Sequence, residues 1–163
     1  MEELNVLLQL EGKTISQDKY GKTYLINDNN LAAVLLARDK DYFILIKQYR
    51  RAINDFTIQL PGGSVEKDED IETAVRREFR EETGYQCGKI ELLGYLPPAS
   101  WISNVVTHVY YSDEIINLSC QKLEDYEQIQ VIKLSVEDTL NMIKDCRIHP
   151  WFCILIFARQ FYS

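Results

Sequence analysis

Glutamates, an arginine and two glycines stand at fixed spacing between residues 63 and 85, and together they could hold a divalent cation over a phosphate. The segment reads GSVEKDEDIETAVRREFREETGY and contains Glu69, Glu78, Glu81 and Glu82. Hard divalent cations such as Mg²⁺ take carboxylate oxygens as ligands. The segment therefore points to metal-assisted chemistry on a phosphate ester or anhydride.

Residues 70–83 are predicted to form the helix that positions these carboxylates. Most of them are good helix formers, and neither proline nor glycine interrupts the run. Three acidic residues, 68 to 70, stand at its start, where negative charge suits the helix dipole. Gly84 follows at the position expected of a helix C-cap.

A helical projection places two of the glutamates on the apolar side of this helix. With Ile71 taken as zero and ~100° per residue, Val75 and Phe79 mark an apolar stripe. Glu78 and Glu82 fall within ~20° of Ile71, inside that stripe. The first half of the helix is thus expected to bury an aliphatic face, and the second half to direct carboxylates the same way.

The alternative is a solvated, salt-bridged helix face, which is the usual interpretation of a charge run. In this projection, however, Arg76 and Arg80 lie opposite Glu78 and Glu82, and Glu81 lies at the border of the stripe. Buried carboxylates without a positive partner are costly, so a divalent metal is the favoured interpretation. Without the metal, repulsion would raise the pKa of at least one carboxyl group.

This segment resembles the signature of the Nudix hydrolases: Gly, five residues, Glu, seven residues, Arg-Glu-aliphatic, one residue, Glu-Glu, one residue, Gly-aliphatic. Its charged and glycine positions are occupied here by Gly63, Glu69, Arg77, Glu78, Glu81, Glu82 and Gly84. Phe79 and Tyr85 stand where an aliphatic residue is usual, and we expect only a local change in packing. The resemblance implies an α/β fold, a Nudix-type α/β/α sandwich with a mixed sheet between helices.

Neighbouring segments resemble the ADP-ribose pyrophosphatase branch of that family. The sequence has Gln-Tyr-Arg at 48–50 and Gln-Leu-Pro-Gly-Gly at 59–63, where the branch has Glu-Leu-Pro-Ala-Gly. Gln59 and Gly62 are therefore departures. Pro97 and Pro98 stand roughly where the branch has a marker proline, but residues 100–104 depart from its Ser-x-Glu ending. The similarity covers the chain from about residue 31 onward. It implies hydrolysis of ADP-ribose to AMP and ribose 5-phosphate with Mg²⁺, or Mn²⁺ as a substitute.

The resemblance also implies roles for the signature residues. Glu78 and Glu82 are expected to be the first metal ligands and Glu81 the next, with Glu81 and Glu82 counted as catalytic. The carbonyl group of Gly62 is expected to reach the metal, although Pro61-Gly62-Gly63 alone reads equally well as an ordinary turn. The residues expected to support the loop and the ligands are Arg77, Glu69, Gly63 and Gly84.

Substrate contacts are expected from residues outside the signature. Arg50 and Arg51 have guanidinium groups that match phosphate oxygens in pairs, although Arg51 also reads as a solvated strand end. Tyr49 and Trp101 are candidates for stacking on a base, with core packing the alternative for Tyr49.

An acidic segment at 123–128 stands where, in the ADP-ribose branch, a mobile loop supplies a further ligand or the general base. Glu127 matches that position best and Asp125 next. A solvated acidic loop is the alternative for either residue.

Hydrophobic periodicity predicts the elements around these residues. Expected strands cover 4–10, 22–26, 31–37, 42–49, 57–60, 90–96, 105–111 and 128–134, and expected helices cover 136–144 and 150–161. The first two strands are expected to pair as a hairpin through a turn at 18–22. The resemblance to the ADP-ribose branch implies a homodimer, and residues 1–30 are the candidate dimerisation hairpin within a single domain, 1–163.

Composition narrows the function class. The chain has 163 residues, is 46% hydrophobic and carries a formal charge of −7, which argues against a nucleic-acid-binding face. Its four cysteines lack paired spacing, so we expect free thiols in a cytoplasmic protein. The start is acidic and lacks the basic residues of a secretory signal. The longest apolar run, 151–158, is too short to span a bilayer, so no membrane partner is expected.

Two other functions remain open at this point. A Nudix enzyme of the same chemistry could act on another nucleotide sugar or on a nucleoside triphosphate. A non-catalytic nucleotide sensor could use the same fold, but it would not need Glu78, Glu81 and Glu82 together. The expected partner is in each case a small nucleotide.

Overall fold

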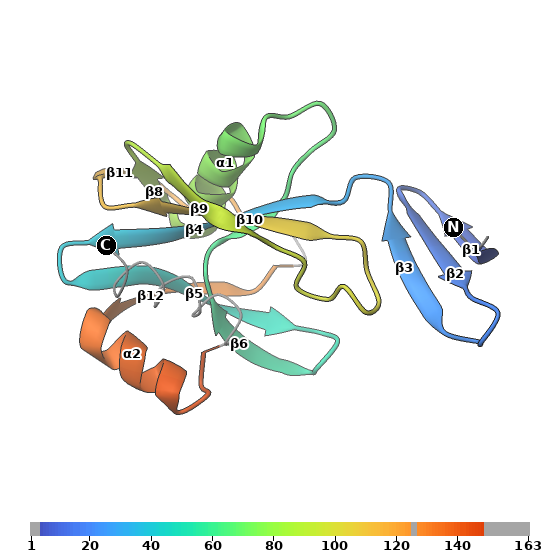
Figure 1. Ribbon diagram of the computed structural model, residues 1–163. Coiled ribbons are helices and arrows are strands. Elements are labelled where there is room, and N and C mark those ends of the chain that lie inside the picture. The colour runs from blue at the N-terminus through green and yellow to red at the C-terminus, as the bar shows by residue number, and fades with distance from the viewer. Residues whose placement is uncertain (1–3, 125–126, 149–163) are drawn as a thin grey trace.

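The computed structural model describes residues 4–124 and 127–148, in which a central mixed sheet lies between two helices (Figure 1). The helices are α1 (Ile71–Thr83) and α2 (Val136–Lys144). The central sheet consists of β4 (Leu31–Asp39), β5 (Tyr42–Arg50), β6 (Asp55–Gln59), β7 (Gly62–Ser64), β9 (Glu91–Leu96), β10 (Val106–Ser112) and β12 (Ile129–Ser135). Neither described helix is long and apolar enough to cross a membrane.

Strand β4 is the centre of this sheet, whose main order is β12-β5-β4-β10-β9. It pairs in parallel with β10 and antiparallel with β5 and β7. Its pairing with β5 covers only the last residues, from Ala37 to Asp39, and β7 pairs with the earlier part, opposite Gly62 and Gly63. The segment that the sequence predicts as a simple turn is therefore a short strand inside the sheet, and it lies directly under α1.

The alternation of side chains along β4 builds one core on each face of the sheet. Ala33, Leu35 and Ala37 pack in the cluster that contains Val75 and Phe79 of α1. Phe79 and Leu35 are fully buried, so the aromatic residue at the aliphatic signature position fills the space under the helix. The apolar stripe predicted from the helical projection is the face that α1 buries.

The other face of the sheet is covered by α2. Val34 and Leu36 of β4 pack in a second cluster, together with Met142 and Ile143. The helix begins after Ser135, whose hydroxyl group accepts a hydrogen bond from the N–H of Asp138 at 3.0 Å. Helices on both faces of a mixed sheet confirm the predicted α/β sandwich. The helix predicted at 150–161 lies outside the described residues.

The N-terminal segment forms a separate three-stranded sheet, at the right in Figure 1, and here the predicted pairing is wrong. Its strands are β1 (Asn5–Leu10), β2 (Lys13–Gln17) and β3 (Thr23–Asn27). The predicted hairpin paired the first with the third, but β2 lies between them and pairs with both. The turn at 18–22 exists and joins β2 to β3. The polar sequence KTISQ hid β2, since it has no continuous apolar run.

Two short strands beyond the C-terminus of α1 were also not predicted. They are β8 (Tyr85–Cys87) and β11 (Ile115–Leu118), which pair with each other. After β11, Ser119 donates to the carbonyl oxygen of Gly84, and the N–H of Lys122 donates to the carbonyl oxygen of Glu81 at 2.9 Å. These bonds satisfy carbonyl groups that a helix C-terminus leaves without partners.

The cysteines that the structure describes, Cys87, Cys120 and Cys146, carry free thiols, as predicted. Cys153 lies outside the described residues.

Candidate functional site

The helix that carries the glutamates is fixed at both ends. Asp70 is its N-cap and accepts a hydrogen bond from the N–H of Thr73 at 3.1 Å. Gly84 is its C-cap, with a left-handed backbone, and its N–H donates to the carbonyl oxygen of Arg80 at 2.8 Å. The helix therefore presents its last turn, with Glu78, Glu81 and Glu82, in a defined orientation.

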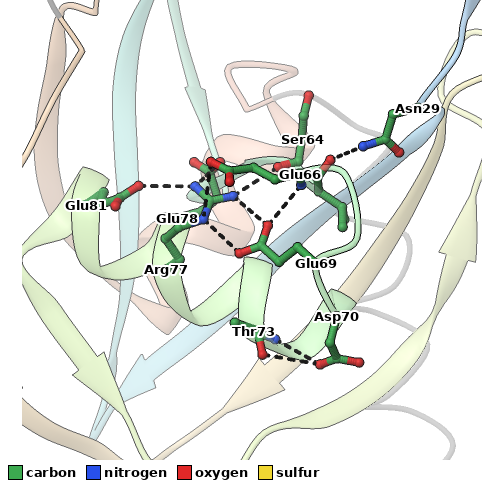
Figure 2. Close-up of polar contacts among 10 residues, drawn as sticks. Asn29, Ser64, Glu66, Glu69, Asp70, Thr73, Arg77, Glu78 and Glu81 are labelled. Atoms are coloured by element: carbon green, nitrogen blue, oxygen red, sulfur yellow. Dashed lines mark hydrogen bonds and ion pairs between the residues drawn. The ribbon is translucent and has the colours of Figure 1, made fainter.

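Arg77 lies among three carboxylates and uses its guanidinium group to hold them (Figure 2). Its Nε donates to Oε1 of Glu69 at 2.9 Å, and its Nη1 donates to Oε1 of Glu78 at 2.9 Å and to Oε2 of Glu81 at 3.2 Å. Its Nη2 bonds the carbonyl oxygen of Ser64 at 3.2 Å. The hydrogen bonds from Arg77 lower the pKa of Glu69, which in turn accepts the N–H of Glu66 at 2.9 Å and closes the loop before the helix.

Glu82 is buried without an ion pair among the described residues. Its side chain points to the sheet, where Oε2 accepts the N–H of Gly62 at 2.6 Å, and the residue is only 3% exposed. Burial is the main cause that raises the pKa of Glu82 to about 8; the charges of Glu78 and Glu127 act in the same direction, and the N–H of Gly62 and the charge of Arg50 oppose the rise. Such a carboxyl group is poised for a cation or a proton.

Glu78 lies in the same pocket but is partly neutralised. Its side chain is 17% exposed and bonded to Arg77. Burial raises its pKa, whereas the hydrogen bond and charge of Arg77 oppose that rise. The carboxylate rests against Gly63, where an added Cβ would lie 2.8 Å from its oxygen. A side chain at 63 would therefore displace the carboxylate of Glu78 from its present position.

Gly62 is required for a different reason. Its φ of 143° lies in a region that L-residues rarely adopt, and a Cβ there would clash with the carbonyl oxygen of Ala33. Only glycine lets β7 lie against β4 while its N–H turns to Glu82. The departure from alanine in the resembling branch thus fits this backbone.

These groups open into a cavity of about 620 Å³. Its polar lining contains carboxylates from α1, arginines from the end of β5 and glycines from β7; the residues are Gln48, Tyr49, Arg50, Arg51, Gly62, Gly63, Ser64, Glu78, Glu82, Glu127 and Gln128. The volume lies within the range of small-molecule sites, which is roughly 300–1,000 Å³. The pairing of acid and guanidinium groups suits a metal–phosphate ligand.

A chain of amide side chains that the sequence analysis missed holds Arg50. Nε of Arg50 donates to Oε1 of Gln59 at 3.2 Å, and the hydroxyl group of Thr57 donates to the same oxygen at 3.0 Å. Nε2 of Gln59 donates to Oε1 of Gln48, which is buried, at 3.2 Å. Alternate residues of a strand share a face, so the sequence spacing could have indicated this contact. Residues 48 and 50 are two apart on one strand, and residues 57 and 59 are two apart on the next.

The other predicted substrate residues are divided between two places. Tyr49 and Arg51 line the cavity with Glu127, and the hydroxyl group of Tyr49 donates to Oδ1 of Asn54 at 2.6 Å. Trp101 does not line it. Trp101 is 56% exposed. Its loop lies beside β3, because the carbonyl oxygen of Ile102 accepts the N–H of Leu25 at 2.7 Å.

The predicted set of three carboxylates is only partly assembled. Glu78 and Glu82 meet at the cavity, whereas Glu81 does not line it and remains bonded to Arg77. Within 4–124 and 127–148, no three acidic, histidine or cysteine side chains lie close enough to hold a metal ion together. The carboxylate oxygens of Glu78 and Glu82 still fit the preference of Mg²⁺ for oxygen ligands. Glu82 makes no ion pair within the described part of the chain. Asp125, a further predicted acidic residue, lies outside the described residues.

Comparisons with known proteins agree with this geometry. A model of the NUDIX domain matches residues 28–146. The chain is 25% identical over 143 residues to an ADP-ribose pyrophosphatase from Bacillus subtilis (strain 168), with 87% of this chain and 77% of that protein covered. It is 27% identical over 154 residues to a methanol dehydrogenase activator from Bacillus methanolicus, with 88% and 78% covered.

Two further comparisons extend the picture. The chain is 28% identical over 137 residues to a GDP-mannose pyrophosphatase from Klebsiella pneumoniae, with 78% of this chain and 68% of that protein covered. A crystal structure of an ADP compounds hydrolase superposes with a TM-score of 0.77 at 14% identity, over 98% of this chain and 94% of the other, and it shows a common fold.

Proposed function

Because the chain belongs to the Nudix family of hydrolases, we propose that it cleaves the diphosphate bond of ADP-ribose and releases AMP and ribose 5-phosphate. The observation that carries this proposal is the cavity in which Glu78 and the buried Glu82 face Arg50 and Arg51. The relationship to the ADP-ribose pyrophosphatase branch supports the choice of substrate.

Mg²⁺ is the metal we propose for this cavity, with Mn²⁺ as a substitute, and a bound metal would neutralise negative charge on the diphosphate. Glu78 and Glu82 would hold it. Glu81 would contribute after release from Arg77, and the carbonyl group of Gly62 is the remaining candidate. Arg77 and Glu69 keep the ligands in place through the bonds described above.

Arg50 and Arg51 bind the diphosphate in this proposal. The Gln59 oxygen fixes Nε of Arg50 and leaves its two terminal nitrogens for phosphate oxygens. Arg50 is exposed at the rim of the cavity, where desolvation by its neighbours lowers its pKa and the charges of Glu82 and Glu127 oppose that shift.

Water attacks one phosphorus atom, the phosphorus–oxygen bond to the leaving phosphate breaks, and a carboxylate accepts the proton of the water. Glu127 is the described residue best suited to accept that proton, since it lines the cavity together with Glu78 and Glu82. Its carboxylate also accepts the N–H of Glu124 at 3.1 Å, which keeps the side chain close to its own loop. Asp125 is the second candidate.

A nucleotide sugar is the alternative substrate, because the sequence similarity to a GDP-mannose pyrophosphatase extends over most of the chain. Incubation with ADP-ribose, GDP-mannose, nucleoside triphosphates and dinucleoside polyphosphates, each with Mg²⁺ and with EDTA, separates the two. We expect the highest kcat/KM for ADP-ribose and no turnover in EDTA. Preference for GDP-mannose would select the alternative, and the absence of turnover of any compound would refute the enzymatic proposal.

We also propose that the chain acts in the cytoplasm, without nucleic-acid or membrane partners, and that it forms a homodimer through its N-terminal sheet. The sheet exposes large apolar residues of β1, among them Val6, Leu7, Leu8 and Leu10 at 48–55%. Such a contiguous apolar strand on the surface marks an interaction site. Light scattering should give twice the monomer mass, and Leu7→Lys should reduce it to the monomer mass.

A further inference from the structure

A second hollow lies against α1 on the side of Arg76 and Arg80, which is opposite Glu78 and Glu82 in the helical projection. It has a volume of about 340 Å³ and is lined by Thr73, Arg76, Arg77, Arg80, Gln86 and Cys87. Three of these six residues are arginines and none is acidic, although the chain as a whole carries a formal charge of −7. The hollow therefore concentrates positive charge on an otherwise acidic protein.

Arg76 is held in a fixed position at this hollow. Its Nη1 donates to the carbonyl oxygens of Cys87 at 3.0 Å and Gly88 at 2.6 Å. Those two bonds use one of the three nitrogen atoms, and no acceptor for Nε or Nη2 lies within the described residues. The guanidinium group is thus preorganised and keeps donors available, which lowers the cost of binding an anion.

Arg80 lies one helical turn after Arg76 and makes no side-chain hydrogen bond within the part of the chain that the structure describes. The described ion pairs within 4.0 Å likewise include neither Arg76 nor Arg80. Arg77 differs, because its donors are spent on Glu69, Glu78, Glu81 and a backbone carbonyl group. The uncompensated charge of the hollow therefore comes from Arg76 and Arg80.

We propose that this hollow is a binding site for a small phosphate-bearing anion, separate from the cavity that holds Glu82. Two guanidinium groups four residues apart on a helix can both donate to one phosphate, and such charge-assisted bonds are the strong ones. The hydroxyl group of Thr73 and the amide of Gln86 line the same space. A volume near the lower end of small-molecule sites suits a phosphate or a small monoester better than a dinucleotide.

The test is a titration of the full chain, in EDTA, with inorganic phosphate and in a second arm with glycerol 3-phosphate. Calorimetry gives the affinity, and the NMR resonances of the arginine Nε–H groups report the location. We expect saturable shifts at Arg76 and Arg80 with both probes. Arg80→Gln should weaken phosphate binding about tenfold, as expected for the loss of one charge-assisted contact, and Arg80→Lys by less.

Two matched variants complete the experiment. Arg38→Gln removes an arginine on the surface of β4, and Arg50→Gln removes the phosphate ligand that we propose for the catalytic cavity. Both should leave the affinity at Arg76 and Arg80 unchanged. Affinity that is lost in Arg50→Gln, affinity that is unchanged in Arg80→Gln, or shifts that never saturate would each overturn this proposal. None of these results measures hydrolysis, so the proposed function is tested separately by the incubation with substrates.

Discussion

Replacing Glu82 by glutamine should make the metal-free protein more stable at alkaline pH while abolishing the proposed activity. Glu82 is 3% exposed and has no ion pair among the described residues, and burial raises its pKa from 4.5 to about 8. The folded protein therefore keeps a proton that the unfolded chain releases. Glutamine retains an oxygen that can accept the N–H of Gly62, but it carries no charge to desolvate.

The sign follows from proton linkage. Below the unfolded-state pKa of 4.5 both states are protonated and Glu82 costs nothing. Above it the unfolded chain loses its proton first, so the free energy of unfolding falls by about 1.4 kcal/mol per pH unit until the folded-state pKa is passed. Between about pH 6 and pH 8 the wild-type protein should lose about 2 kcal/mol through this residue.

The assay is urea unfolding of both proteins in EDTA at several pH values, with melting temperatures as a second measurement. For a chain of this size, 2 kcal/mol corresponds to about 4–8 °C in Tm. Glu72→Gln, an exposed residue in the first turn of the same helix, is the matched control and should keep the wild-type pH dependence.

Two results would refute the reasoning. If Glu82→Gln falls in stability with pH as steeply as the wild type, the carboxyl group does not carry the buried proton. If both Glu82→Gln and Glu72→Gln remove the slope, the effect comes from net charge and not from burial. Addition of Mg²⁺ should restore stability at pH 8 in the wild type only, since Glu82→Gln removes the charged ligand.

Three further predictions concern neighbouring residues. Gln59→Glu should form an ion pair with Arg50 in place of the present 3.2 Å hydrogen bond, and steady-state kinetics should show KM raised about tenfold with a smaller change in kcat. Gly63→Ala would put a methyl group 2.8 Å from the carboxylate of Glu78, so the affinity for Mg²⁺, measured by calorimetry, should fall about tenfold or more. Phe79→Ala should lower the free energy of unfolding by about 3–5 kcal/mol in urea titrations, because the ring is fully buried under α1.

The sequence predicted the helix that carries the glutamates almost to the residue, since Asp70 and Gly84 are strong end signals and the apolar stripe is regular. It did not predict that Arg77 would hold Glu81 away from the cavity. The helical projection gives the direction of a side chain from the axis, but whether a carboxylate bonds to a neighbouring guanidinium group depends on rotamers that no periodicity records.

Other contacts could not be predicted because they depend on how strands pair in the folded protein. Gln59 and Thr57 belong to β6, and they meet Arg50 only because β6 pairs with β5 in one register. The sequence predicts a turn where β7 forms, because three small residues have no pattern until β4 supplies a partner. Trp101, a candidate for stacking on a base, lies in a loop beside β3 and is absent from the lining of the cavity, and its stacking role stays a prediction.

The alternation along β4 has a practical consequence for redesign of the molecule. Leu35 packs under the helix that bears the glutamates, whereas Leu36, its immediate neighbour, packs under α2 on the far face. Libraries that vary the α2 layer can thus tune solubility and heat tolerance while the layer that aligns the acidic groups stays untouched. Neighbouring residues of the same strand can therefore be varied for different purposes, since each contributes to a different core.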